Sequence, residues 1–170
     1  MTDRLQSDST LVQFSERLTN SAQFGTLFRE GMDLVEETAA YLDGVGRSEA
    51  KALDRAVSLT YATESMRLTT RLMQLASWLL LHRAVKEGEM TLTQANREKT
   101  KVKLSAADPG PTEMIEKLPA QLQDLIARSM SLQARVRRLD STIHSPPSER
   151  NAIGNPLVPQ LNRLKAAFEQ

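Results

Sequence analysis

The sequence contains no cysteine, few aromatic residues (4% of 170) and only two histidines. Without cysteine, the chain can form no disulfide bond, no thiol nucleophile and no cysteine-ligated zinc site, which suits a reducing cytoplasm. His82 and His144 lie far apart, and neither belongs to a Glu-x-x-His pair of the kind that binds two metal ions in a helix bundle. We therefore expect neither a metal nor another cofactor.

Long apolar runs are also missing. The longest, residues 72–81, is interrupted by Gln74 and Ser77, whereas a membrane-spanning helix needs roughly 20 apolar residues. Residues 1–20 contain no apolar segment typical of a secretory signal. The sequence therefore predicts a cytoplasmic protein without membrane insertion.

Sequence motifs for catalysis are absent too. The chain has no glycine-rich phosphate loop, no nucleophile elbow and no Walker motif. Glu64 is the only acid between Tyr61 and Leu81, and Arg67 and Arg71 stand at helical spacing from it, which is typical of an ion pair beside the core. Acid–base catalysis would require a second carboxylate close by. We predict that the protein is not an enzyme.

The residues that are abundant favour helices over strands, namely Leu, Ala, Met, Gln, Glu and Arg. Amphipathic patterns predict helices at about 21–43, 49–87 and 119–143, with a short helix at about 92–99. The expected fold is all-α, an antiparallel up-down-up three-helix bundle over residues 21–144 with a long central helix and flexible termini. Residues 1–20 are expected to form a mobile tail, and residues 145–170 a flexible one.

Local signals set the expected helix ends. Ser48 is a suitable N-cap for the central helix, and Gly88 is a suitable stop. Thr91 and the glutamine three residues later match a capping box before the short helix. Pro119 suits the start of the third long helix. The connection over residues 88–117 is long for a compact bundle, which indicates a functional role.

Two apolar stripes follow the central helix, and we expect each to contact one neighbouring helix. The first consists of Leu68, Leu72, Leu75, Leu79 and His82. The second consists of Met66, Thr69, Met73, Ala76 and Leu80.

A third face of the central helix is expected to point outward as a partner or dimer interface, because Trp and Arg are enriched in interface hot spots. It consists of Arg67, Arg71, Gln74, Trp78 and Leu81. An alternative is that Trp78 covers the core beneath the 88–117 connection while the arginines form local ion pairs.

The third long helix carries an unbroken apolar row at 4-3-4-3 spacing, which predicts a seam packed against the other helices. The row consists of Leu118, Leu122, Leu125, Ser129, Leu132, Val136, Leu139 and Ile143. Past a proline-rich spacer, the end of the chain has a further apolar row that is a candidate for docking in a partner groove. It consists of Leu157, Leu161, Leu164 and Phe168. The alternative is a disordered end with incidental leucines.

Two short basic strings allow a different interpretation, a small DNA-associated regulatory protein. One string includes Lys99, Lys101 and Lys103, and the other includes Arg135, Arg137 and Arg138. Neither contains the aromatic residues that often accompany nucleic-acid binding, and the net charge is only +1. We therefore expect solvated basic faces and no nucleic-acid partner. A helical scaffold subunit with no role in proteolysis is a further alternative.

Residues 61–90, YATESMRLTTRLMQLASWLLLHRAVKEGEM, resemble the signature region of the RcdA family of alphaproteobacteria, the regulators of CtrA degradation. Residues 34–53, LVEETAAYLDGVGRSEAKAL, resemble the first helix and turn of that family. The likeness spans about Phe24–Lys103 and extends loosely through the third helix. It does not include the C-terminal tail.

The resemblance implies a homodimeric, non-catalytic adaptor in proteolysis by ClpXP. In that scheme the adaptor joins protease already primed by the response regulator CpdR, tethers protein substrates, and connects to the cyclic-di-GMP effector PopA for degradation of CtrA. The resemblance also implies concentration at a cell pole.

Overall fold

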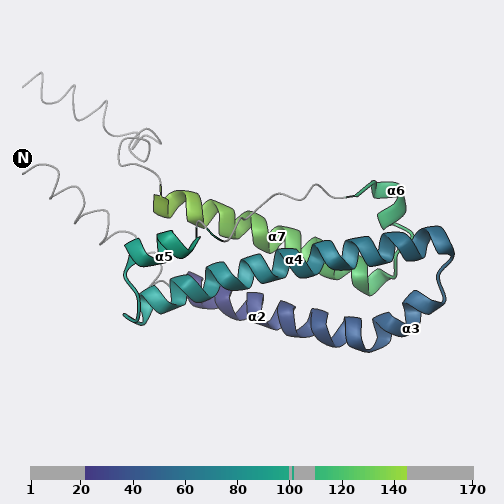
Figure 1. The fold of residues 1–170 in the computed structure, drawn as a ribbon, viewed down its shortest axis with the longest axis horizontal. Coiled ribbons are helices and arrows are strands. Elements are labelled where there is room, and N and C mark those ends of the chain that lie inside the picture. The colour runs from purple at the N-terminus through teal and green to yellow at the C-terminus, as the bar shows by residue number, and fades with distance from the viewer. Residues whose placement is uncertain (1–21, 100, 102–109, 145–170) are drawn as a thin grey trace, which may run out of the picture.

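The computed structural model describes residues 22–99, 101 and 110–144 (Figure 1). Within these ranges the chain forms helices and no strand, as the sequence predicted. The helices are α2 (Ala22–Asp43), α3 (Val45–Lys51), α4 (Arg55–Lys86), α5 (Leu92–Lys99), α6 (Thr112–Ile115) and α7 (Ala120–His144). Both predicted tails, and with them the docking row at 157–168, lie outside the described residues.

The three long helices α2, α4 and α7 pack against one another along their lengths (Figure 1). At one end of the molecule Phe24 of α2 contacts Trp78 of α4, with 6.3 Å between the ring centroids. At the other end Tyr41 of α2 and Tyr61 of α4 meet beside Gly46. Helices α2 and α4 are therefore antiparallel.

Helices α4 and α7 run parallel, so the predicted up-down-up order is wrong. Arg71 of α4 donates to Ser129 of α7, and Trp78, seven residues further along the same face, donates to Asp140. Partners that advance together along both helices define a parallel pair. The order of the long helices is up-down-down (Figure 1).

The length of the connection between α4 and α7 explains this order. Helix α4 has 32 residues and is about 48 Å long, so a parallel α7 must begin far from where α4 ends. Helix α5 lies at the end of α4, where Lys99 contacts Asp140. Helix α6 lies at the opposite end (Figure 1). The connection over residues 88–117 is long because the chain must run back along the length of α4 before α7 can begin.

The predicted central helix is shorter than expected at its start. Ser48 is not an N-cap but lies inside α3, and α4 begins only at Arg55. Asp54, at the N-cap position, has an extended backbone (φ −65°, ψ 160°), so the chain turns between α3 and α4. At the other end Gly88 has φ 75°, a left-handed conformation that glycine adopts without steric cost. The predicted stop at Gly88 is confirmed.

The core is aliphatic and follows two of the predicted rows. On α4 the row from Leu68 to His82 is buried throughout, and on α7 all of the predicted seam is buried except the partly buried Leu139. The short helix α5 also begins as predicted. The backbone N–H of Thr91 donates to the Gln94 side chain at 2.9 Å, and the N–H of Gln94 donates to the Thr91 hydroxyl at 3.2 Å.

Candidate protein-interaction surface

The second predicted core stripe of α4 is on the surface, which overturns the expectation that it packs within the chain. Met66 is 72% exposed, Met73 66% and Leu80 52%, and Leu59, one heptad earlier, is 71% exposed. We call these four residues the α4 outer row. In a chain of this size, large apolar side chains grouped on one face indicate a binding surface rather than chance exposure.

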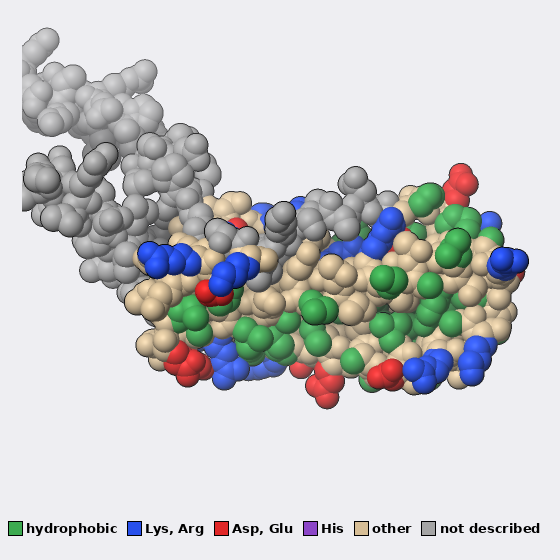
Figure 2. Space-filling view, viewed as in Figure 1, with side chains coloured by type: hydrophobic (Ala, Val, Ile, Leu, Met, Phe, Trp, Pro, Cys, Tyr) green, Lys and Arg blue, Asp and Glu red, His purple; other side chains and the backbone are tan. Residues whose placement is uncertain are grey.

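The exposed side chains that α4 itself places around its outer row are uncharged, although Glu98 and Lys101 line a shallow pocket with Leu80. Between Ala56 and Leu81, none of the fully exposed side chains of α4 is charged. The half-buried Arg67 forms an ion pair with the buried Glu64. In the space-filling view, hydrophobic side chains form a band along the middle of the molecule, and charged side chains gather at its edges (Figure 2). On the side of the molecule seen in Figure 2, the exposed apolar surface therefore lies in this band.

The predicted outward face of α4 points inward at two of its five positions. Trp78 is 1% exposed and Arg71 is 4% exposed, so the expectation of an exposed interface is wrong for both. Arg67, Gln74 and Leu81 are half-buried, and their membership of a partner interface stays a prediction.

Trp78 joins three helices at one end of the molecule. Its ring stacks on His82 with 3.9 Å between the centroids, and its indole N–H donates to the carboxylate of Asp140 at 2.8 Å. The same carboxylate accepts from Lys99 of α5 at 2.6 Å. Trp78 thus covers the core beneath the connection that follows α4, which is the alternative that the sequence left open.

The buried charges of α4 form a polar cluster at the α4–α7 contact. The Arg71 guanidinium donates to the Ser129 hydroxyl at 2.8 Å, and that hydroxyl donates to the carbonyl of Ile126. Burial lowers the pKa of Arg71, and the negative charge of nearby Glu64 opposes this shift. Arg67 donates to the Glu64 carboxylate at 2.6 Å. With every charge in contact with a polar partner, the cluster serves packing and carries no free acid or base.

Gly110 lies directly on the pair of Glu64 and Arg67. A Cβ atom at this position would meet the Oε1 atom of Glu64 and the Nη1 atom of Arg67. The chain entering α6 therefore covers the polar cluster closely, and a larger residue at this position would have to displace the ends of these two side chains.

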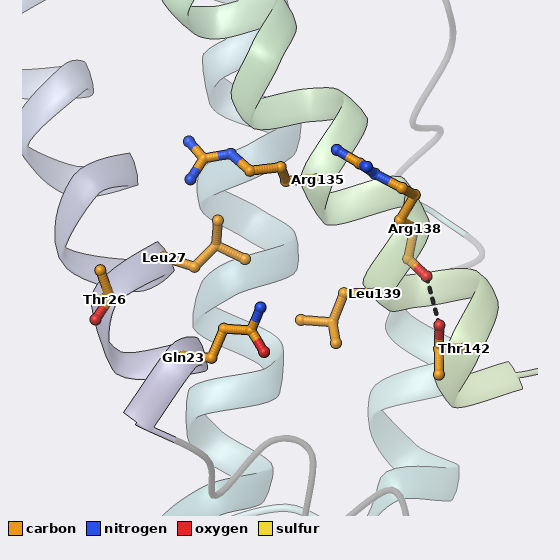
Figure 3. Close-up of a pocket in the computed structure, with 7 residues that line it drawn as sticks. All are labelled: Gln23, Thr26, Leu27, Arg135, Arg138, Leu139 and Thr142. Carbon is orange, nitrogen blue, oxygen red and sulfur yellow. Dashed lines mark hydrogen bonds between the residues drawn. The ribbon is translucent and has the colours of Figure 1, made fainter.

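A cavity of about 550 Å³ separates the start of α2 from the end of α7 (Figure 3). Leu27 and Leu139 point toward each other across it, and Arg138 lies on its α7 side (Figure 3). Its remaining lining residues are Gln23, Thr26, Arg135 and Thr142. No carboxylate or histidine is among them, so this lining offers no acid–base pair for catalysis.

No group of three or more candidate metal ligands occurs in the part of the chain that the structure describes. Among the same residues, no helix is both long and apolar enough to cross a membrane.

Comparison with known proteins agrees with the resemblance in the sequence. The model of a family described as "Protein of unknown function (DUF1465)" matches residues 15–168. A crystal structure of RcdA from Caulobacter crescentus CB15 is similar, with 50% sequence identity and a TM-score of 0.62. The similarity covers 75% of this chain and 96% of that chain. This chain belongs to the RcdA family. A search of the curated proteins gave no match.

For this RcdA-family chain, sequence reasoning placed the apolar surface on the wrong face of α4. The spacing carried no signal that would have separated the two rows. The residues at 59, 66, 73 and 80 repeat every seven positions, and so does the buried row with its alternating intervals of four and three.

Proposed function

We propose that this RcdA-family chain is a non-catalytic adaptor in regulated proteolysis. In this role it tethers CtrA-type cell-cycle regulators to ClpXP protease that has been primed by the response regulator CpdR. The observation that supports this most directly is the α4 outer row, an exposed apolar surface on a helix whose buried Arg71 and Trp78 have hydrogen-bond partners within the chain. The membership of the RcdA family, the regulators of CtrA degradation, is the reason for proposing a role in proteolysis.

The proposed mechanism is tethering. An adaptor that holds a substrate beside the unfoldase raises its effective concentration, typically to about the millimolar range for short flexible links, without changing the peptidase. A rigid helical scaffold is suited to this task because it presents separate surfaces at fixed positions. We include a PopA-type cyclic-di-GMP effector among the partners, together with a second copy of the chain, and we place the protein in the cytoplasm and at a cell pole.

A reconstituted degradation assay tests the proposal. Purified ClpXP, CpdR, PopA and cyclic-di-GMP are mixed with CtrA at sub-saturating concentration, with and without this chain. We expect the chain to lower the KM for CtrA while cleavage of a short peptide by the protease stays unchanged. CtrA degradation that is equally fast without the chain would contradict the proposal.

The C-terminal row is proposed as a second contact of the adaptor. Its residues are Leu157, Leu161, Leu164 and Phe168. In the same assay, a chain that ends at residue 144 should lose part or all of the stimulation. Full stimulation by the shortened chain would remove the tail from the proposal.

The rival function, DNA association, would use the basic strings. Several of their side chains form ion pairs within the chain: Arg135 pairs with Glu30, Lys99 with Asp140, and Lys101 with Glu98. These contacts reduce the positive charge available to phosphates. A salt-sensitive shift of duplex DNA that is lost on neutralising Arg135, Arg137 and Arg138 would favour this rival.

A further inference from the structure

The cavity between the start of α2 and the end of α7, here called the α2–α7 cavity, is lined by two cations and by no anion. Its charged lining residues are Arg135 and Arg138 (Figure 3). Its volume of about 550 Å³ lies in the range of about 300–1,000 Å³ that is typical of ligand sites. The lining therefore favours an anionic occupant over a cationic one.

Arg138 is the charge that is available to a ligand. Its side chain is exposed, and within the described residues its guanidinium forms no ion pair or hydrogen bond. It extends from α7 toward the side chain of Arg135, at the edge of the cavity (Figure 3). A guanidinium presents a planar fork of donors that matches the two oxygens of a carboxylate.

Arg135 has a donor without a partner at the same place. One end of its guanidinium donates to the carboxylate of Glu30, so most of its charge is neutralised within the chain. Its Nε–H is buried and has no hydrogen-bond partner among the described residues. Buried donors in native proteins nearly always have a partner. An acceptor that enters the cavity beside Arg138 would supply one.

The other polar groups of the lining leave few donors free. The hydroxyl of Thr26 donates to the carbonyl of Ala22 at 3.1 Å, and that of Thr142 donates to the carbonyl of Arg138 at 2.8 Å. The amide of Gln23 is exposed and points into the cavity (Figure 3). The free donors are therefore this amide and the two guanidinium groups.

The remaining walls of the cavity are apolar. Leu27 and Leu139 point toward each other across it (Figure 3), so an occupant must carry an apolar group next to its anionic group. One unpaired guanidinium balances one negative charge, whereas a phosphate group carries about two at neutral pH. A carboxylate beside an apolar side chain fits this lining better, and the last residue of a polypeptide has that chemistry.

The opening of the cavity favours the end of a protein over a free small acid. Gln23, Thr26 and Arg138 are exposed, so one side of the cavity faces solvent. A small ligand usually has most of its surface buried in its site. The end of a chain needs cover only for its last residues, and the rest of the chain can leave through the open side.

We infer that the α2–α7 cavity binds the C-terminal end of a partner protein whose last residue is apolar. The terminal carboxylate contacts Arg138 and the Nε–H of Arg135, and the last side chain packs between Leu27 and Leu139. The inference deepens the proposed function, on which it rests for the partner being a protein substrate. It adds a binding site and the chemistry that this site recognises.

Fluorescence anisotropy with the full chain tests the inference. The probes are fluorescein-labelled peptides that share the sequence Gly-Ser-Gly-Ser-Ala and end in alanine, valine, leucine or phenylalanine with a free carboxylate. We expect at least one of them to bind, and the same peptide with a C-terminal amide should bind at least about 10-fold more weakly, because the amide carries no charge. No rise in anisotropy with any of these peptides, or equal binding of the acid and the amide, would overturn the inference.

Variants of Arg138 locate the binding in the cavity. Arg138→Gln should weaken binding by at least about 10-fold, and Arg138→Lys should weaken it less, because lysine keeps the charge but lacks the fork of donors. The matched control is Arg55→Gln, which makes the same change of charge at an exposed position at the opposite end of the molecule (Figure 1). It should leave binding unchanged. Both positions are exposed, so thermal unfolding should also be unchanged. Equal weakening by the two glutamine variants would refute the assignment to the cavity.

Competition separates a chain end from other anions. N-acetyl-leucine has the same terminal group as the leucine peptide, and we expect it to compete at least about 10-fold more weakly, because it lacks the preceding residues. Inorganic phosphate should compete more weakly still. Competition by N-acetyl-leucine that equals that of the unlabelled peptide would assign the cavity to a small acid, and stronger competition by phosphate would assign it to a phosphate group. Either result would overturn the inference.

The two proposals fail in different ways, because the peptide assay contains no protease. If the peptides bind as expected and the chain does not stimulate CtrA degradation, the inference stands and the adaptor proposal is wrong. If the chain stimulates degradation and none of the peptides binds, the adaptor proposal stands and the inference is wrong.

Discussion

Two glycines of α2 lie in opposite surroundings. A Cβ atom added at Gly31 would collide with the side chain of Leu79, which is fully buried, whereas a Cβ atom at Gly25 would meet nothing within 4 Å. Glycine at position 31 is therefore required by the close approach of α2 to α4. At position 25 glycine only makes the helix less stable than alanine would.

This contrast predicts opposite effects of the same substitution within one helix. Gly25→Ala should raise the free energy of unfolding by about 0.5–1 kcal/mol, because alanine restricts the unfolded chain and favours the helix. Gly31→Ala should lower it by about 1–3 kcal/mol, because Leu79 must leave its packed position. Urea denaturation measures both. An equal gain in stability from the two substitutions would show that α2 and α4 are less tightly packed at Gly31.

Tyr41 makes the stability of the fold sensitive to alkaline pH. Its hydroxyl donates to the Glu49 carboxylate at 2.7 Å, and its ring is 3% exposed. Burial, together with this hydrogen bond, raises the pKa of Tyr41 well above its ordinary value. At pH values below the ordinary tyrosine pKa of about 10, the neutral phenol therefore stabilises the folded state. This contribution is lost as the pH rises further, because the unfolded chain ionises there and the folded chain does not.

Tyr41→Phe should reveal this contribution. At pH 7 the variant should be about 1 kcal/mol less stable than the unaltered chain, because it lacks the hydrogen bond to Glu49. Between pH 9 and pH 11 that difference should shrink by about 1 kcal/mol, since phenylalanine cannot ionise. Because the pKa of Tyr61 depends on Tyr41, both proteins are compared in a Tyr61→Phe background. A difference that stays constant up to pH 11 would contradict the prediction; urea denaturation at each pH measures it.

At the scale of whole elements, α4 shows what periodicity can and cannot predict. The row from Leu68 to His82 and the α7 seam were predicted correctly, because alternating steps of four and three define one helix face. The row with Met66 and Met73 is just as apolar, and periodicity does not tell whether its partner is a helix of the same chain or another molecule. Arg71 and Trp78 were expected outside because they lie on neither apolar stripe and because Trp and Arg are enriched in interface hot spots. The structure buries them with Ser129 and Asp140 as hydrogen-bond partners, which stand more than fifty residues away in the sequence.

Helix α5 is held to the rest of the molecule by a small number of contacts. Ala95 is fully buried, and Lys99 contacts the carboxylate of Asp140, which also accepts from Trp78. The side chains of Lys99 and Asp140 are 23% and 18% exposed, so solvent screens this ion pair less than a surface pair.

Asp140→Asn tests this attachment. The amide oxygen can still accept from the indole of Trp78, but the charge that attracts Lys99 is gone. We expect amide hydrogens of α5 to exchange about 10-fold faster, while those at the centres of α2 and α7 change little. The control is Glu98→Gln, which removes the exposed pair with Lys101 and should have almost no effect. Equal acceleration in α2, α5 and α7 would mean that Asp140 supports the whole fold rather than α5.

At the scale of the whole molecule, the direction of α7 was the main error of the sequence analysis. Amphipathic patterns define the faces of helices, and they contain no information about direction, because a stripe is equally apolar when the helix is reversed. An antiparallel order was assumed because adjacent helices joined by short links pack that way. The length of the 88–117 connection was the one feature of the sequence that argued against it. It was interpreted as a functional loop, although a return along α4 accounts for it.

Shortening this connection tests the up-down-down order. If residues 88–117 are replaced by four glycine and serine residues, seven residues remain between Lys86 and Ala120, and they reach at most about 25 Å. A parallel α7 needs a link of about 48 Å, the length of α4. We therefore expect the shortened chain, at low concentration, to lose cooperative thermal unfolding and the fluorescence of a buried Trp78. A glycine and serine linker of the original length should restore both, at lower stability because α5 and α6 are missing. In an up-down-up bundle the short link would suffice, so a cooperatively folded monomer with four linker residues would mean that α7 runs antiparallel to α4.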